Sequence, residues 1–157
     1  MTECVRPEEL QRWHSLVLMD APARISLEAS AGVRCVWCDA STREAGVDLG
    51  LGHIPLRCCL TCYMGRLAWM ATWWDWHDHI AACAACLRGA TCYVARGRRA
   101  LHAATIARGG SGPMCCHLCH GQVADHEAAV AVAWSGQSGV RLSYAHIVPC
   151  LVREAAR

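Results

Sequence analysis

The chain has 157 residues, of which 54% are hydrophobic and 18% charged, and its formal net charge is +2. This apolar fraction excludes a disordered tail, and the longest apolar run, 128–134, is far too short to span a bilayer. Thirteen residues are Cys, nine are His, and all basic residues are Arg.

The cysteines indicate metal binding rather than disulfides. The first twenty residues include several acidic ones and lack the apolar core of a secretory signal, so we expect a cytoplasmic protein. The number of cysteines is odd, and most occur as C-x-x-C, a spacing at which two thiols converge on one metal ion. The pairs are Cys35/Cys38, Cys59/Cys62, Cys83/Cys86 and Cys116/Cys119.

Residues 1–33 contain no C-x-x-C pair and are expected to form an N-terminal helical cap. Apolar residues recur with helical spacing over 7–19, and Pro7 suits the first turn of a helix. The cysteine of this segment, Cys4, has no assigned role.

The first zinc module is expected over 34–80, where a C-x-x-C knuckle precedes a hairpin and a helix. The expected elements are strands at 44–50 and 53–57 and a helix at 59–82. Trp69, Trp73 and Trp76 share one face of that helix, which we interpret as core.

The second module, 79–108, is Cys-rich and mainly helical, with a helix expected over 93–108. It offers four closely spaced ligands: His79, Cys83, Cys86 and Cys92. His77 is a rival ligand to His79.

The glycine-rich segment 109–113 is expected to be a linker, and the third module occupies 114–157. A second knuckle, Cys116/Cys119, precedes a hairpin with strands at 128–134 and 140–144. His146 and Cys150 follow at the start of a C-terminal helix that contains Pro149.

These ligands divide economically into three sites, so we expect about three Zn²⁺ per chain. The sets are Cys35, Cys38, Cys59 and Cys62; His79, Cys83, Cys86 and Cys92; and Cys116, Cys119, His146 and Cys150. Four protein ligands leave no open position, which is typical of structural sites. Cys58 and Cys115 adjoin ligands and could replace them.

The order knuckle, hairpin, ligands at a helix resembles the treble-clef zinc fingers. This resemblance implies a small metal-stabilised α+β fold with two treble-clef-like modules flanking the Cys-rich helical module. The helix start presents free N–H groups to the thiolates.

The segment from His79 to Ala124 contains no Asp or Glu but several arginines, which favours nucleic-acid binding in transcription regulation. The candidate contacts are Arg88, Arg96, Arg98, Arg99 and Arg108. The alternative is a protein–protein adaptor, which would use this segment and the tryptophan stripe. We expect no membrane contact and no small-molecule substrate.

A second resemblance covers 62–99. The spacing of Cys62, Cys83, Cys86 and Cys92, followed by arginines, is similar to the WhiB-like iron–sulfur regulators, which implies a [4Fe–4S] cluster and a redox-responsive transcription regulator.

A third resemblance is to the HNH nucleases, whose general-base His follows a strand as His146 does in 145–149. We rank this last, because Cys150 lies one turn beyond His146 and makes it a metal ligand. No phosphate-binding loop or Walker pattern occurs, so the expected function is non-enzymatic.

Overall fold

The structure is a computed structural model that describes residues 17, 25–50, 53, 55–109, 112–136 and 139–151. The helix expected over 7–19 lies outside these residues apart from Val17, and so does Cys4. The middle of the expected linker 109–113 and residues 152–157 also lie outside them.

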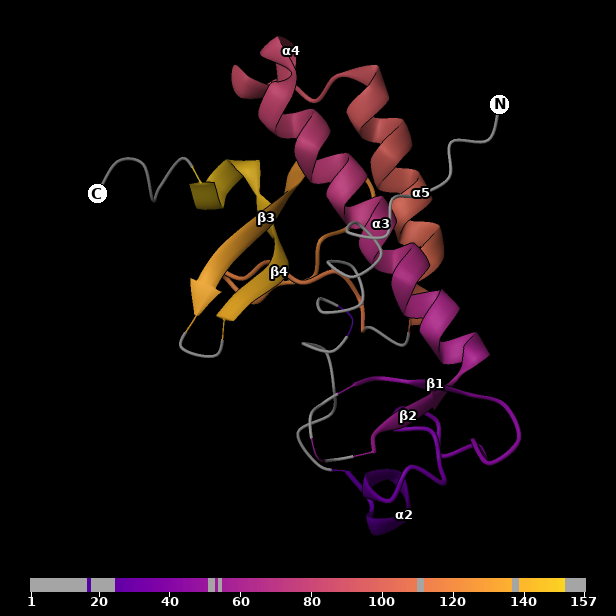
Figure 1. The fold of residues 1–157 in the computed structure, drawn as a ribbon. Helices are drawn as coiled ribbons and strands as arrows, with labels where there is room; N and C mark the ends of the chain where they lie inside the picture. Colours follow the sequence, from indigo (N-terminus) through magenta and orange to yellow (C-terminus); the bar gives the residue numbers. More distant parts are fainter. Residues whose placement is uncertain are drawn as a thin grey trace, which may run out of the picture. The chain divides into compact units, whose positions relative to one another are not determined.

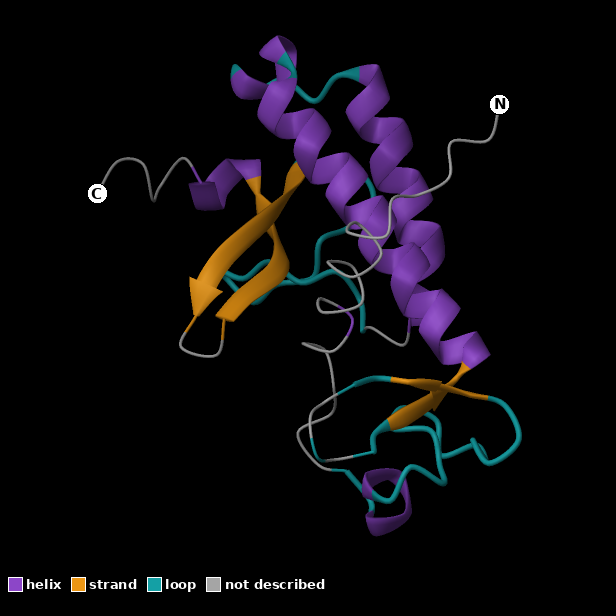
Figure 2. Ribbon diagram, in the orientation of Figure 1, coloured by secondary structure: helices purple, strands orange, loops and turns teal. Residues whose placement is uncertain are grey.

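The described chain is a small α+β fold with two antiparallel sheets of two strands each (Figures 1 and 2). The elements are α2 (Leu27–Ser30), β1 (Gly46–Asp48), β2 (Arg57–Cys59), α3 (Leu60–Ala82), α4 (Ala84–Leu87), α5 (Tyr93–Gly109), β3 (Ala129–Gly136), β4 (Gly139–His146) and the π-helical turn η1 (Ile147–Leu151). In the described part of the chain, no helix has both the length and the hydropathy needed to cross a membrane.

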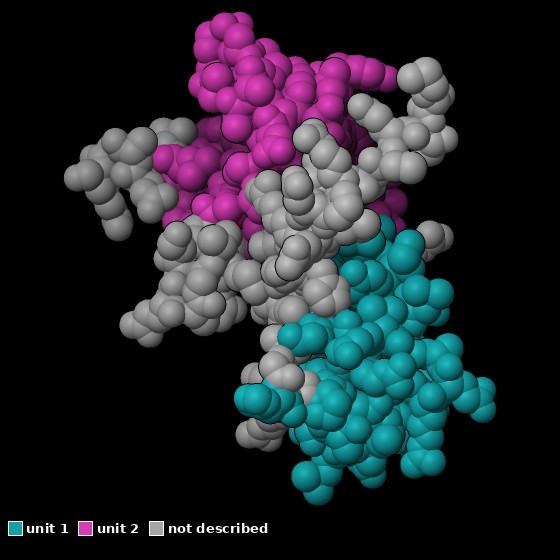
Figure 3. Space-filling model, in the orientation of Figure 1, with its two compact units in different colours: residues 1–71, 107–110 teal, residues 72–106, 111–157 magenta. Residues whose placement is uncertain are grey.

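The chain divides into two compact units, and the division falls within α3 (Figure 3). Unit 1 comprises Met1–Ala71 and Ala107–Gly110, and unit 2 comprises Thr72–Ile106 and Ser111–Arg157.

In unit 1, β2 begins later than the sequence predicts. The strand expected at 53–57 is observed at Arg57–Cys59, so Cys59 ends a strand instead of starting a helix. The reason is burial: Leu56 and Cys58 alternate into the core beside Leu49, which donates its N–H to the Leu56 carbonyl over 2.9 Å. This burial also determines the register of the β1–β2 pair, in which Val47 lies opposite Cys58.

In unit 2, the hairpin of β3 and β4 packs its small side chains, Ala129, Ala131 and Ala145, into the interior. Ala129 and Ala131 lie on the face of the hairpin that also carries Tyr144, whose ring stacks on Trp76 of α3 at 6.2 Å. Trp73 and Trp76 are 0% and 1% exposed. The Trp73 indole N–H donates to the Ser143 carbonyl over 3.1 Å. These two tryptophans are therefore core residues.

α5 joins this core through a fully buried imidazole. Nε2 of His102 lies 2.6 Å from the Tyr144 hydroxyl, and Nδ1 lies 3.0 Å from Oγ1 of Thr72 on α3. Both ring nitrogens thus have partners, which a buried imidazole requires. The contact aligns α5 beside the second half of α3 (Figure 1).

The helix expected after His146 begins as the single wide turn η1 and is interrupted at Val148, which is extended (φ −125°, ψ 132°). The cause is Pro149, because proline disfavours a helical conformation at the preceding residue.

Candidate metal centres

Three groups of four Cys and His side chains could each hold a metal ion. In each group the four ligand atoms all lie within 4.8 Å of one another. Site 1 consists of Cys35, Cys38, Cys59 and Cys62; site 2 of His79, Cys83, Cys86 and Cys92; and site 3 of Cys116, Cys119, His146 and Cys150. The structure thus brings together the twelve side chains that the spacing grouped.

Site 1 lies in unit 1, between a turn and the junction of β2 with α3. Sγ of Cys38 lies 3.7 Å from Sγ of Cys59, the last residue of β2. The first turn of α3 carries Cys62, whose backbone N–H donates to Sγ of Cys59 over 3.4 Å. A free N–H at a helix start stabilises a thiolate.

Site 2 is built from the end of α3 and the two short segments that follow it. Nε2 of His79 lies 3.0 Å from Sγ of Cys92, and Sγ of Cys86 lies 3.7 Å from the same sulfur. The rival His77 is directed elsewhere: its Nδ1 lies 3.2 Å from Oδ1 of Asp78, and its ring stacks on Trp73 at 5.0 Å. His79 therefore completes this group.

Site 3 lies in unit 2, where β4 ends at His146 and η1 supplies Cys150. Nδ1 of His146 lies 3.5 Å from Sγ of Cys119 and 3.8 Å from Sγ of Cys150. Its other nitrogen, Nε2, lies 3.3 Å from Oε2 of Glu127. The imidazole thus presents Nδ1 to the thiols and Nε2 to a carboxylate.

Glu127 is a functional candidate that could not be found from the sequence alone. Its carboxylate also accepts a hydrogen bond from the Ala124 N–H over 2.7 Å. This hydrogen bond lowers the pKa of Glu127; desolvation opposes the shift and His146 contributes to it. A carboxylate behind a metal-binding imidazole fixes its tautomer and orientation. Glu127 follows no ligand spacing in the sequence, and only the return of β4 beside it creates the contact.

The first cysteine of each knuckle accepts hydrogen bonds from the backbone N–H groups two and three residues later. These donors are Trp37 and Cys38 for Cys35, Ala85 and Cys86 for Cys83, and Leu118 and Cys119 for Cys116. Burial opposes them at Cys35 and Cys116, yet the pKa of Cys35 falls to about 7 and that of Cys116 to about 6. The backbone at all three sites therefore favours a thiolate, the form that binds metal.

Cys62 and Cys150, the last ligands of sites 1 and 3, behave in the opposite way. Burial and neighbouring thiols raise the pKa of Cys62 and bring that of Cys150 to about 12. Crowded sulfurs cannot all ionise alone because their charges repel, whereas a bound cation stabilises four ligands together.

Sites 1 and 3 share one backbone hydrogen-bond pattern, position by position. The N–H of Cys35 donates to the Ala40 carbonyl, as that of Cys116 does to the Gly121 carbonyl. The N–H of Thr42 donates to the Val33 carbonyl, as that of Val123 does to the Met114 carbonyl. The N–H of Val36 donates to the Arg57 carbonyl, as that of His117 does to the Tyr144 carbonyl. All six bonds measure 2.7–3.1 Å. Asp39 and His120, the residues after each knuckle, both have φ of 60°. The two knuckles are thus alike although their second ligand pairs differ.

The remaining cysteines are placed differently. Cys58 is 0% exposed in the core of unit 1, and burial raises its pKa to about 12. Cys115 is exposed. Neither belongs to a group of four in the described part of the chain.

The iron–sulfur and nuclease alternatives meet specific obstacles. A cluster of the WhiB-like kind would need Cys62 beside Cys83, Cys86 and Cys92, but Cys62 lies in site 1 and His79 completes site 2. A nuclease would need a free nitrogen on His146, and both of its nitrogens already face the thiols and Glu127.

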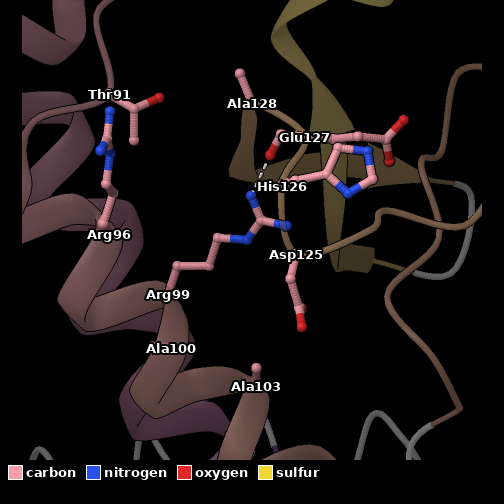
Figure 4. A pocket seen from close by; sticks show the side chains of 9 residues that line it. All are labelled: Thr91, Arg96, Arg99, Ala100, Ala103, Asp125, His126, Glu127 and Ala128. Atoms are coloured by element: carbon pink, nitrogen blue, oxygen red, sulfur yellow. Dashed lines mark hydrogen bonds between the residues drawn. The ribbon is translucent and has the colours of Figure 1, made fainter.

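The five arginines proposed as nucleic-acid contacts fall into two classes. Arg98 pairs with Asp75 at 2.9 Å. Arg99 is 8% exposed, and its guanidinium donates to the carbonyls of Ala124 (2.6 Å) and Glu127. Figure 4 shows the hydrogen bond to Glu127. Both arginines therefore serve internal contacts. Arg88 and Arg96 are exposed, and the side chain of Arg108 lies outside the described part.

A cavity of about 600 Å³ in unit 2 lies beside this contact. Arg96 and Arg99 line it from α5, and Asp125, His126 and Glu127 line it from the opposite loop (Figure 4). Burial lowers the pKa of Arg99, and the charges of Asp125 and Glu127 raise it. The acidic side chains thus offset the charge of Arg99 within the cavity.

No protein-family model matches the chain, and no curated protein or solved structure matches it. Its function must therefore be argued from the sites themselves.

Proposed function

We propose that each of the three sites holds one Zn²⁺ and that these ions are structural. The observation that carries the proposal is that each group supplies four ligands, all thiols or imidazoles, the set that zinc prefers in closed tetrahedral sites. Such a site has no position for a reacting water, which supports a non-enzymatic role.

Sites 1 and 3 are proposed to be treble-clef-like modules. Each has a knuckle, a hairpin, a third ligand at the end of the second strand and a fourth in the following helical turn. Their shared hydrogen-bond pattern supports this grouping.

Metal analysis of the purified chain tests the proposal. About three zinc ions per chain are expected. About two zinc with four iron would assign site 2 to an iron–sulfur cluster instead, and a chain that folds with no metal would overturn the proposal.

We further propose that the chain binds nucleic acid in a regulatory role. Arg88 and Arg96 support this, since both are exposed and neither forms an ion pair with another described residue. The alternative, an adaptor that docks through the tryptophan stripe, loses support because Trp73 and Trp76 are buried.

The dependence of binding on salt distinguishes the two roles. Nucleic-acid affinity should fall steeply as salt rises, because bound phosphates release counterions. Absence of binding to any oligonucleotide at low salt would contradict this role, and a salt-insensitive protein partner would favour the adaptor.

A further inference from the structure

We propose that the surface around site 2 binds single-stranded nucleic acid, with the ring of Tyr93 as a stacking platform and with Arg88 and Arg96 as phosphate contacts. This surface, the site 2 face, consists of Leu87, Arg88, Tyr93 and Arg96. The inference rests on the proposed nucleic-acid role and specifies its ligand and its contacts.

Tyr93 is the most exposed of the large hydrophobic side chains in the described residues. It is 90% exposed, and Leu87 nearby is 66% exposed. An aromatic ring left in water at the start of a helix contributes nothing to the core. Its face is therefore free for a ligand.

The ligands of site 2 bring the parts of this face together. Leu87 and Arg88 follow Cys86 directly, Tyr93 follows Cys92 directly, and the Sγ atoms of these two cysteines lie 3.7 Å apart. A metal ion at site 2 would therefore hold both segments of the face.

The backbone of the face is also fixed by hydrogen bonds. The Leu87 N–H donates to the Cys83 carbonyl and the Gly89 N–H to the Cys86 carbonyl, both over 2.9 Å. Gly89 has φ of 82°, the left-handed conformation that turns the chain toward Cys92. On the other side the Ala95 N–H donates to Sγ of Cys92 over 3.3 Å. A pre-formed surface loses little conformational entropy when it binds.

The charge of the face suits phosphates. Arg96 lies three residues after Tyr93, so both are on the same side of α5. No acidic residue occurs between His79 and Ala124. Of the acidic residues close to α5, Asp75 is paired with Arg98, while Asp125 and Glu127 face Arg99. Arg88 therefore keeps its charge available for a ligand. Arg96 is exposed as well, although it also lines the cavity that contains Asp125 and Glu127.

An exposed tyrosine accompanied by exposed arginines favours single strands over duplexes. A duplex hides the faces of its bases by stacking them on one another, whereas an unpaired base offers a face to the ring. Every base has such a face, so the contact tolerates many sequences. The exposed apolar side chains in and beside this face are Leu87, Tyr93 and Val94, which together make a surface much smaller than a stable protein–protein interface requires.

Fluorescence anisotropy with the zinc-loaded full chain tests the inference. The probes are labelled 12-nucleotide single strands of RNA and of DNA and the DNA duplex of the same sequence, at low salt. The variants are Tyr93→Ala, Tyr93→Trp, Arg88→Ala and Arg96→Ala. Arg43→Ala, which removes an exposed arginine from unit 1, is the matched control. Circular dichroism and zinc content establish that each variant is folded.

Both single strands should bind more tightly than the duplex. Tyr93→Ala should weaken single-strand binding about 5- to 100-fold, and Tyr93→Trp should retain it, because stacking requires only an aromatic face. Each of Arg88→Ala and Arg96→Ala should reduce the salt slope by about 0.7, the contribution of one phosphate contact on a single strand. Arg43→Ala should bind like the wild type.

Two results overturn the inference and identify different failures. If the duplex binds as tightly as the single strands, or if Tyr93→Ala binds normally while the arginine variants do not, the nucleic-acid role stands and the stacking platform is wrong. If no probe binds the zinc-loaded chain at low salt, the nucleic-acid role itself fails and this inference fails with it.

Discussion

The knuckles of sites 1 and 3 have the same hydrogen-bond pattern, but the loops that follow them are supported differently. In unit 1, the guanidinium of Arg57 donates to the carbonyls of Thr42 and Gly46, both over 2.9 Å. In unit 2, the corresponding loop receives Arg99, which reaches the carbonyls of Ala124 and Glu127. Arg57 belongs to β2, the strand that carries the third ligand of its own site, whereas Arg99 belongs to α5.

The difference shows that a repeated metal module can be supported by an arginine of its own hairpin in one place and by an arginine of a neighbouring helix in another. In the described residues, the guanidinium that supports the site 1 loop belongs to the strand carrying Cys59. Site 3 relies on α5, because Arg99 holds the loop that carries Glu127, and Glu127 orients His146.

Removal of all metal should have the largest effect on folding, and it should abolish the difference between sites 1 and 3. Each structural zinc ion contributes on the order of 10 kcal/mol of apparent binding energy to folding. We expect a strong chelator to unfold most of the chain, measured as loss of helical circular dichroism. A spectrum that stayed unchanged after complete metal removal would show that the fold does not depend on the sites.

Loss of the ion from one site at a time should show that site 3 depends on α5 and that site 1 does not. Cys35→Ser and Cys116→Ser should each lower the zinc content by about one ion per chain, because each removes a thiolate from a four-ligand set. Hydrogen exchange should then increase near site 1 alone in the first variant, but also in α5 in the second. Increased exchange confined to the mutated module in both variants would contradict the dependence of site 3 on α5.

Removal of the supporting arginines should have a moderate effect. Arg57→Ala and Arg99→Ala should each destabilise the chain by roughly 2 kcal/mol, since each leaves two carbonyls without a charged donor. Chemical denaturation measures the change in the free energy of unfolding. Only Arg99→Ala should also lower zinc affinity at site 3. Arg96→Ala, an exposed neighbour on α5, should be nearly neutral, and an equal loss there would show that the buried contacts of Arg99 are unimportant.

The Glu127→Gln variant should have the most localised effect. It keeps the size of the side chain but removes the charge behind His146, so zinc affinity at site 3 should fall about 10- to 100-fold. Competition with a chromophoric chelator measures the affinity of each site, and site 1 should be unchanged. Identical affinities at site 3 in the variant and the wild type would remove Glu127 from the metal centre.

The sequence predicts the local parts of this molecule well, because its signals are local. The C-x-x-C spacings indicate three groups of ligands, and the helix expected over 93–108 is observed as Tyr93–Gly109. The hairpin signals locate both sheets, although burial of Cys58 moves β2 toward the C-terminus.

The parts that could not be predicted depend on contacts between distant segments. From the sequence, Arg98 and Arg99 are expected to be surface charges, because their partners lie far away in the chain. These partners are the carboxylate of Asp75 and the carbonyls of Ala124 and Glu127. Every residue has a backbone carbonyl, so the amino-acid sequence does not indicate which carbonyls accept hydrogen bonds from an arginine. The same applies to Glu127, whose importance appears only when His146 returns beside it.

The three ligand sets follow one another along the chain without interleaving: the first is complete at Cys62, the second at Cys92 and the third at Cys150. A ribosome would therefore finish each set before it made the first ligand of the next. Ions could be captured one after another as the polypeptide emerges, and few foreign thiols would compete for an ion at any stage. Mispairing of ligands would then be limited by the timing of synthesis as well as by the stability of the finished fold.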